Sequence, residues 1–211
     1  MKNREGRQYR AMSMNIAEGE QKIVEGYAST FEEPYTLFRD ADLKMEVREV
    51  IDRDAFAETD MTDVIMQYDH KGRVFARKRN NTLTVTPDDH GLFIQADLGG
   101  TEIGRQLYEE IQGGYTDRMS FGFTIGKESR SESEEDGWAV YTYRVEKVGK
   151  LYDVSAVSLP ANEGTEISAR GLDDGVIAEL KAERLARIEE ARRDAERRSA
   201  LIARLKGELE K

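Results

Sequence analysis

Apolar and polar positions alternate along most of this chain in the two-residue period of β-strands. The clearest alternation runs over residues 119–126, where Met119, Phe121, Phe123 and Ile125 would share one face. The serine, the threonine and the two glycines between them would form the other face. The pattern therefore predicts a strand with one core face and one bare face that is open to a second chain.

Similar β-rich segments predict further strands at 22–31, 46–51, 64–68, 83–86, 91–98, 138–146 and 149–159. A helix is expected from Thr101, which can cap it, because Ile103, Leu107 and Ile111 recur every four residues. The acidic, serine-rich stretch 129–137 predicts an exposed, mobile loop that could cover a neighbouring groove.

The pattern changes after Gly175 to a segment without proline that is rich in Ala, Leu, Glu and Arg, which predicts a long helix. A thin apolar stripe, broken by Arg198, follows this segment and consists of Ile188, Ala191, Ala195, Ile202, Leu205 and Leu209. It fits either a solvated helix or an arm that binds a partner. Three parts are expected: a flexible N-terminal segment (1–20), a main domain (21–172) and a charged helical tail (173–211).

The charge and composition of the chain argue against several classes of protein. The 211 residues carry a formal net charge of -10. The segment 176–211 has ten Lys and Arg against eight Asp and Glu, which leaves 22 against 34 in residues 1–175. So acidic a body is a poor general binder of nucleic acid. The absence of cysteine fits a reducing cytoplasm, and neither a membrane span nor a secretory signal is expected.

Only two histidines are available as a general base. His90 belongs to a Pro-Asp-Asp-His-Gly turn, where a structural or merely exposed histidine is expected. His70 follows the strand predicted at 64–68 and shares the parity of its apolar residues, so it is expected at the end of an apolar face. Asp69, its neighbour, would point the opposite way.

Asp153 lies in the segment 151–159, which is apolar on both faces and is therefore expected to be buried. A buried carboxylate is costly unless it is paired. The imidazole of His70 is one candidate partner. An ion pair with Arg118, Arg144 or Lys150 is the alternative.

Ser120, on the bare face, needs a base to become a nucleophile, and that base needs a group to orient it. His70 and Asp153 supply those two roles from separate predicted strands. A Ser/Lys hydrolase with Lys127 or Lys150 as the base remains open. A metal hydrolase is not expected, because two distant histidines and no cysteine do not make a usual ligand set.

Several segments together resemble the prohead (procapsid maturation) proteases of tailed bacteriophages. They are Tyr68-Asp69-His70, Thr101-Glu102-Ile103-Gly104-Arg105, Met119-Ser120-Phe121-Gly122-Phe123, Asp153-Val154-Ser155 and Pro160-Ala161-Asn162. Their order and spacing match from about Val24 to Ile167. The resemblance implies a fold similar to the herpesvirus assemblins: an α+β domain with a small, mostly antiparallel β-barrel and flanking helices, followed here by the charged helix.

The resemblance also implies site residues. His70 matches the family's base, Ser120 its nucleophile, and Asp153 the acidic residue, which is often glutamate in the family. The family often has Asn where this chain has Asp69. From the residues themselves, the candidates for oxyanion donors are backbone N–H groups near Phe121 or in the approach at 113–118. Gly122, Thr124 and Gly126 beside the nucleophile predict a shallow groove in which an extended peptide would add as a strand.

The implied function is a serine endopeptidase without cofactor or metal that acts inside the immature capsid in the host cytoplasm. Its substrates would be scaffold, or the scaffolding segment of the major capsid protein, and finally itself, and self-association or packaging in the prohead would bring it there. A non-enzymatic scaffold or assembly protein that binds through its charged tail is the alternative from another class.

Overall fold

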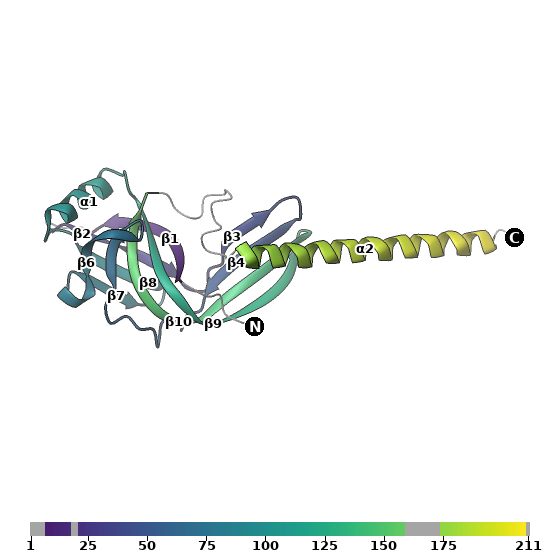
Figure 1. Cartoon of the computed structure of the whole chain (residues 1–211), viewed down its shortest axis with the longest axis horizontal. Coiled ribbons are helices and arrows are strands. Elements are labelled where there is room, and N and C mark those ends of the chain that lie inside the picture. The colour runs from purple at the N-terminus through teal and green to yellow at the C-terminus, as the bar shows by residue number, and fades with distance from the viewer. Residues whose placement is uncertain (1–6, 18–20, 159–173, 210–211) are drawn as a thin grey trace.

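The computed structural model describes residues 7–17, 21–158 and 174–209 (Figure 1). Its strands are β1 (Arg7–Ile16), β2 (Ile23–Thr30), β3 (Tyr35–Asp40), β4 (Met45–Ile51), β5 (Ile65–Tyr68), β6 (Lys71–Arg77), β7 (Leu83–Pro87), β8 (Gly91–Asp97), β9 (Arg118–Glu135) and β10 (Trp138–Val157). The helices are α1 (Glu102–Gln112), α2 (Asp174–Leu209) and the short 3-10 helix η1 (Lys78–Asn80). The architecture is thus α+β and mostly sheet.

The strands form one sheet in the order β3-β4-β10-β9-β1-β2-β8-β7, with β5 also on β10 and β6 on β5. The expected β-barrel is wrong, because the sheet does not close: within the described residues, β3 and β7 each have a neighbour on one side only. The physical reason lies in β9 and β10, which have 18 and 20 residues. Strands about 60 Å long extend well beyond the height of a small barrel.

These two strands carry the sheet out of the body as an arm, which β3 and β4 extend (Figure 1). The mobile loop expected at 129–137 is therefore wrong. Residues up to Glu135 continue β9, and Asp136 and Gly137, both with positive φ, make a two-residue hairpin turn to Trp138. Strand pairing holds this acidic stretch in place, so it does not cover a groove.

The two last predicted strands are one strand, β10, with bulges between Val145 and Asp153. Gly149, which directly follows the break at 147–148 between the two predicted strands, lies among these bulges and approaches Gly126 on β9. Such bulges bend a strand without ending it. The break in the hydrophobic pattern thus marks the bend from arm to body.

Residues 7–16 form β1, which pairs with β2 and β9, where the sequence predicted a flexible N-terminal segment. The polar and small residues of β1 show no clear alternation of apolar and polar positions, so its strand structure depends on pairing with β2 and β9. The sequence also missed β3 and β6. The expected helix α1 is confirmed: the hydroxyl of Thr101 accepts a hydrogen bond from the backbone N–H of Gly104, and Leu107 and Ile111 are buried.

The described residues form two hydrophobic cores. The larger one lies in the body and includes Phe121, Phe123 and Val154. The smaller one lies in the arm, where Leu37, Met45, Val47, Ala139, Tyr141 and Tyr143 meet Ile177 and Leu180 of α2. Tyr35 packs against both cores.

A fully buried ion pair, Arg10–Glu49, lies beside Tyr35. The Arg10 Nη2 atom is 2.6 Å from Glu49 Oε2, and its Nε atom is 2.7 Å from Glu49 Oε1. Tyr35 also donates its hydroxyl to Glu49. Burial works to lower the pKa of Arg10, but the charge of Glu49 and the hydrogen bonds that Arg10 donates to Glu49 and Tyr35 outweigh it and raise that pKa. The pair therefore links the body strand β1 to the arm strand β4.

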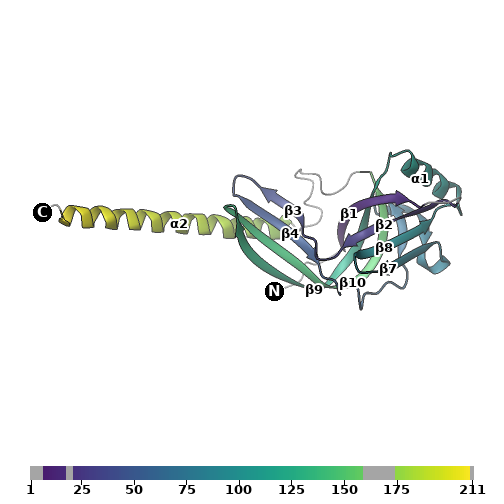
Figure 2. The ribbon, with the colours of Figure 1, turned by 180° about the vertical axis from the view of Figure 1, so that it is seen from behind.

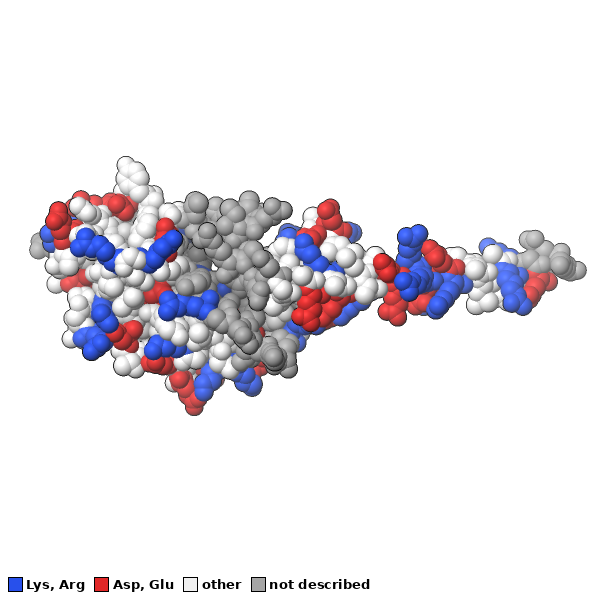
Figure 3. Space-filling view, viewed as in Figure 1, with Lys and Arg blue, Asp and Glu red and all other residues white. Residues whose placement is uncertain are grey.

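Within the described residues, α2 docks on the arm over its first turns, up to Arg187. Besides Ile177 and Leu180, the contacts include Lys181 Nζ at 2.9 Å from Asp40 Oδ2 and Arg187 Nη2 at 2.7 Å from Glu132 Oε2. Beyond this point the helix runs away from the body (Figure 2), with acidic and basic side chains intermixed along it (Figure 3). Its apolar side chains there are exposed, Leu201 by 57%.

Candidate active site

Three neighbouring strands carry the predicted site residues. In the middle strand β10, Ser155 pairs with Ser120 of β9 on one side. On the other side, Ala156 pairs with Tyr68, the last residue of β5. Asp153 therefore lies on the strand between Ser120 and the β5 end that leads to His70.

His70 lies in a hairpin turn and not on a strand. Asp69 and His70, with φ of 48° and 60°, are the two turn residues between the paired Tyr68 and Lys71. The expectation that His70 continues an apolar strand face is thus wrong, because two left-handed residues redirect the chain. Aspartate tolerates this conformation as asparagine does, which accounts for Asp69.

The turn is anchored to β10 by Asp69. Its backbone N–H donates to the carbonyl of Ala156 at 2.9 Å. Its carboxylate accepts hydrogen bonds from the backbone N–H and the hydroxyl of Ser158, each at 3.2 Å. These bonds fix the hairpin tip against the strand that carries Asp153.

The imidazole of His70 meets the carboxylate of Asp153, with Nδ1 2.5 Å from Oδ1. Asp153 is fully buried, while the His70 side chain is 16% exposed. A carboxylate only accepts, so the contact places the proton on Nδ1 and leaves Nε2 as a proton acceptor. This contact joins the two side chains that the sequence predicted to be partners.

Two further groups face the Asp153 carboxylate. Ser155 donates its hydroxyl to Oδ1 at 2.7 Å, and the Arg7 guanidinium lies 3.6 Å from Oδ2. Within the described residues, Oδ2 accepts no hydrogen bond. Sequence reasoning missed Arg7 because it assigned no strand there.

The alternative partners of Asp153 are engaged elsewhere. Arg144 pairs with Glu32 and Asp52, and Lys150 pairs with Asp60. Arg118 lies 3.5 Å from Asp117. The alternative prediction, an ion pair between Asp153 and Arg118, Arg144 or Lys150, is therefore wrong.

Ser120 lies near the start of β9, on the face that Asp153 and Ser155 share, because directly paired residues of neighbouring strands point the same way. Met119 and Phe121 point to the other side into the body core, as the alternation predicted. The two-faced strand is thus confirmed over this part of β9.

The face of Ser120 is covered, although the sequence predicted a bare, open one. Ser120 is 3% exposed, and Gly122 is also buried. Ser120 and His70 form no hydrogen bond with each other, and the Ser120 hydroxyl has no such partner within the described residues. Contacts between nucleophile and base are often loose before substrate binds.

The groove residues expected beside Ser120 are placed as follows. The Phe121 side chain stacks on Phe123 in the core, with ring centroids 4.7 Å apart. Gly122 pairs with Asp153, and Thr124, half-buried, pairs with Lys150. Because β1 and β10 flank β9 here, its backbone faces two neighbours, so no edge is left for strand addition at Gly122 and Thr124.

The two lysines offered as alternative bases are engaged in surface ion pairs. A hydrogen bond to Glu146 raises the pKa of Lys127, and one to Asp60 raises the pKa of Lys150. A lysine base needs its pKa lowered. These shifts run in the wrong direction for a Ser/Lys mechanism.

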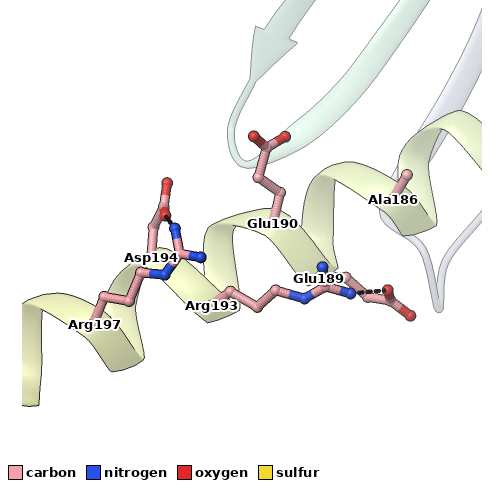
Figure 4. Close-up of a pocket in the computed structure, with 6 residues that line it drawn as sticks. All are labelled: Ala186, Glu189, Glu190, Arg193, Asp194 and Arg197. Carbon is pink, nitrogen blue, oxygen red and sulfur yellow. Dashed lines mark hydrogen bonds and ion pairs between the residues drawn. The ribbon is translucent and has the colours of Figure 1, made fainter.

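The remaining features lie away from this constellation. His90 is exposed and packs edge-on against the Tyr27 ring. A pocket along α2 is lined by Ala186 and charged residues of the same helix, of which Arg193 pairs with Glu189 and Arg197 with Asp194 (Figure 4). The described residues contain no cluster of three metal-ligating side chains and no helix long and apolar enough to cross a membrane. The Pro160-Ala161-Asn162 motif falls outside the described residues.

A model of the caudovirus prohead serine protease family matches residues 8–175. The chain belongs to this family. It is therefore a serine protease, and the family places it in phage capsid maturation within the procapsid. Family membership also decides against the non-enzymatic scaffold. No curated protein matches the sequence.

A solved structure, that of the bacteriophage T4 capsid assembly protease, is similar at 13% sequence identity. The similarity covers 72% of this chain and 99% of that one, with a TM-score of 0.38.

Proposed function

We propose that this prohead protease cleaves scaffold, or the scaffolding segment of the major capsid protein, and then itself, by Ser-His-Asp acyl-enzyme chemistry. The contact between His70 Nδ1 and Asp153 Oδ1, at 2.5 Å, carries this proposal. It leaves Nε2 of His70 as the acceptor for the proton of a nucleophile. Ser120 lies in a segment that resembles the family's nucleophile region, and it shares the face of Asp153.

The reaction runs in two halves. Ser120 Oγ attacks the scissile carbonyl carbon while His70 Nε2 takes its proton, and the imidazolium then gives that proton to the leaving amine. Water next attacks the acyl ester, with His70 again as the base, and frees the second product and Ser120. Asp153 stays ionised and stabilises the imidazolium throughout.

Two neighbouring hydroxyls are poorer candidates for the nucleophile. Ser155 is fully buried and donates a hydrogen bond to Asp153, and Ser158 donates one to Asp69. Both therefore have structural partners, whereas Ser120 has none within the described residues. This contrast favours Ser120.

The helix α2 would bring the protease to its substrate. Its exposed apolar stripe and intermixed charges fit a helical partner such as scaffold, or a second copy of the chain. On this proposal the stripe serves delivery into the prohead, and it is not needed for bond cleavage.

The test is co-expression with the neighbouring capsid and scaffold proteins, as wild type and as Ser120→Ala, with intact masses of every product. Fragments of a partner and of the protease that vanish in Ser120→Ala support the proposal. Identical masses in both samples, with assembled shells present, contradict it. A Ser29→Ala variant, which removes a buried strand hydroxyl on β2, is the matched control and is expected to cleave like the wild type.

A further inference from the structure

The Ser155 hydroxyl is the one donor besides His70 that bonds the Asp153 carboxylate within the described residues. Both bonds end on Oδ1, at 2.7 Å from Ser155 Oγ and 2.5 Å from His70 Nδ1. Ser155 is fully buried. Because the carboxylate cannot donate, the Ser155 proton is committed to it.

We propose that Ser155 is a positioning residue, which fixes the Asp153 carboxylate so that Oδ1 faces the imidazole of His70. The inference rests on the proposed catalytic roles of His70 and Asp153. It assigns to Ser155 no contact with substrate and no part in bond making.

The geometry explains why the carboxylate needs such a partner. The terminal torsion of an aspartate is soft, and its two oxygens exchange by rotation. Oδ2 has no hydrogen bond within the described residues, only the Arg7 guanidinium at 3.6 Å. The bond from Ser155 therefore selects which oxygen turns to His70.

The position of Ser155 in the sheet makes it rigid. Ser155 lies two residues after Asp153 on the same face of β10, between β9 and β5. It is the direct partner of Ser120 across the strands. The Ser155 hydroxyl thus holds the Asp153 carboxylate, and the Ser155 backbone pairs with Ser120 on β9.

A purely structural hydroxyl would behave differently on removal. Ser29 is the matched control: it is 1% exposed on β2, and its hydroxyl donates to the Thr30 carbonyl at 3.2 Å. Ser29→Ala and Ser155→Ala both delete a buried hydroxyl from a strand. Of these two variants, only Ser155→Ala removes a hydrogen bond from the Asp153 carboxylate that contacts His70.

The first readout is the ring proton on Nδ1 of His70, observed by NMR in the full chain with Ser120→Ala, so that no cleavage occurs. We expect a far-downfield resonance that is absent in His70→Ala and Asp153→Asn. It should broaden by exchange with water in Ser155→Ala and persist in Ser155→Thr and Ser29→Ala. An unchanged resonance in folded Ser155→Ala overturns the proposal.

The second readout is the rate of partner cleavage in the co-expression time course. Loss of a hydrogen bond to a charged group predicts a 10- to 100-fold slower rate in Ser155→Ala, with rescue by Ser155→Thr. Equal rates in Ser155→Ala and the wild type would overturn the positioning role while Ser120 dependence still upheld the proposed function. Cleavage that no longer depended on Ser120 would overturn both the positioning role of Ser155 and the proposed function.

Discussion

His70 and Asp153 are joined through Nδ1 and Oδ1 at 2.5 Å, although 82 residues separate them in the chain. The contact depends on two features of the fold. The left-handed turn at Asp69–His70 directs the imidazole toward β10, and the parallel pairing of β5 with β10 brings the turn beside Asp153.

The Asp153→Asn variant should keep the fold and lose activity. An amide fits the same space, but it cannot stabilise an imidazolium as a carboxylate does. We expect cleavage to fall by about 10²- to 10⁴-fold in the co-expression time course. Asp60→Asn, which removes an exposed carboxylate paired with Lys150, is the control and should leave the rate unchanged. Equal rates in both variants would remove Asp153 from the mechanism.

The two possible bases are separated by Lys150→Met and His70→Ala. Lys150 is held charged by Asp60, so its loss should change the cleavage rate less than about twofold. His70→Ala should abolish cleavage, as Ser120→Ala does. A rate that survives in His70→Ala and disappears in Lys150→Met would establish a Ser/Lys enzyme instead.

Much of the body could be predicted from the sequence because its strands bury one face. The alternation around Ser120 gave the correct faces, and the buried character of Asp153 implied a partner. The pattern failed where a strand has few apolar residues. In β1 and in the outer part of β9, from 129 to 135, pairing with neighbouring strands decides the structure.

The sequence predicted the contact between His70 and Asp153 but only part of the geometry around it. Parity placed His70 on the wrong face because a two-residue turn with positive φ cannot be read from apolar spacing. Arg7 was missed together with β1. The cover over Ser120 depends on tertiary packing, which a local pattern does not contain.

The buried pair Arg10–Glu49 should be costly to break. In Glu49→Ala the guanidinium would lose its bidentate partner inside the protein, and we expect the free energy of unfolding to fall by about 3–5 kcal/mol. Urea denaturation measures it. Glu196→Ala breaks an exposed pair with Arg192 and should cost less than about 1 kcal/mol. Equal effects would refute the role of the buried pair.

Docking of α2 should depend on Leu180 and not on Leu201. Leu180 is 1% exposed in the arm core, whereas Leu201 is 57% exposed. Leu180→Ala should weaken docking by about 2–4 kcal/mol and speed hydrogen exchange in residues 175–184. Leu201→Ala should leave that exchange unchanged. Faster exchange in Leu201→Ala would mean that the outer helix also contacts the body.

Acid should loosen the same contact. A hydrogen bond from Lys181 lowers the pKa of Asp40 below its ordinary 3.8. A lowered pKa in the folded state adds stability that is complete above the ordinary value and disappears as the pH falls through the lowered one. The difference in exchange of residues 175–184 between the wild type and Asp40→Asn, below about 1 kcal/mol, should thus be steady from pH 7 to about 5. It should decline as the pH falls below 3.8 and vanish once the pH is below the lowered pKa of Asp40. A difference that persists there would contradict this pairing.

The most direct test of the central claim is to map the adduct of a small fluorophosphonate on the full chain by mass spectrometry. Such a probe is attacked by an activated serine oxygen and releases fluoride. We predict one adduct, on Ser120, that is absent in His70→Ala and in Ser120→Ala. An adduct on another serine, or none in a preparation that still cleaves its partner, would contradict Ser120 as the nucleophile that His70 activates.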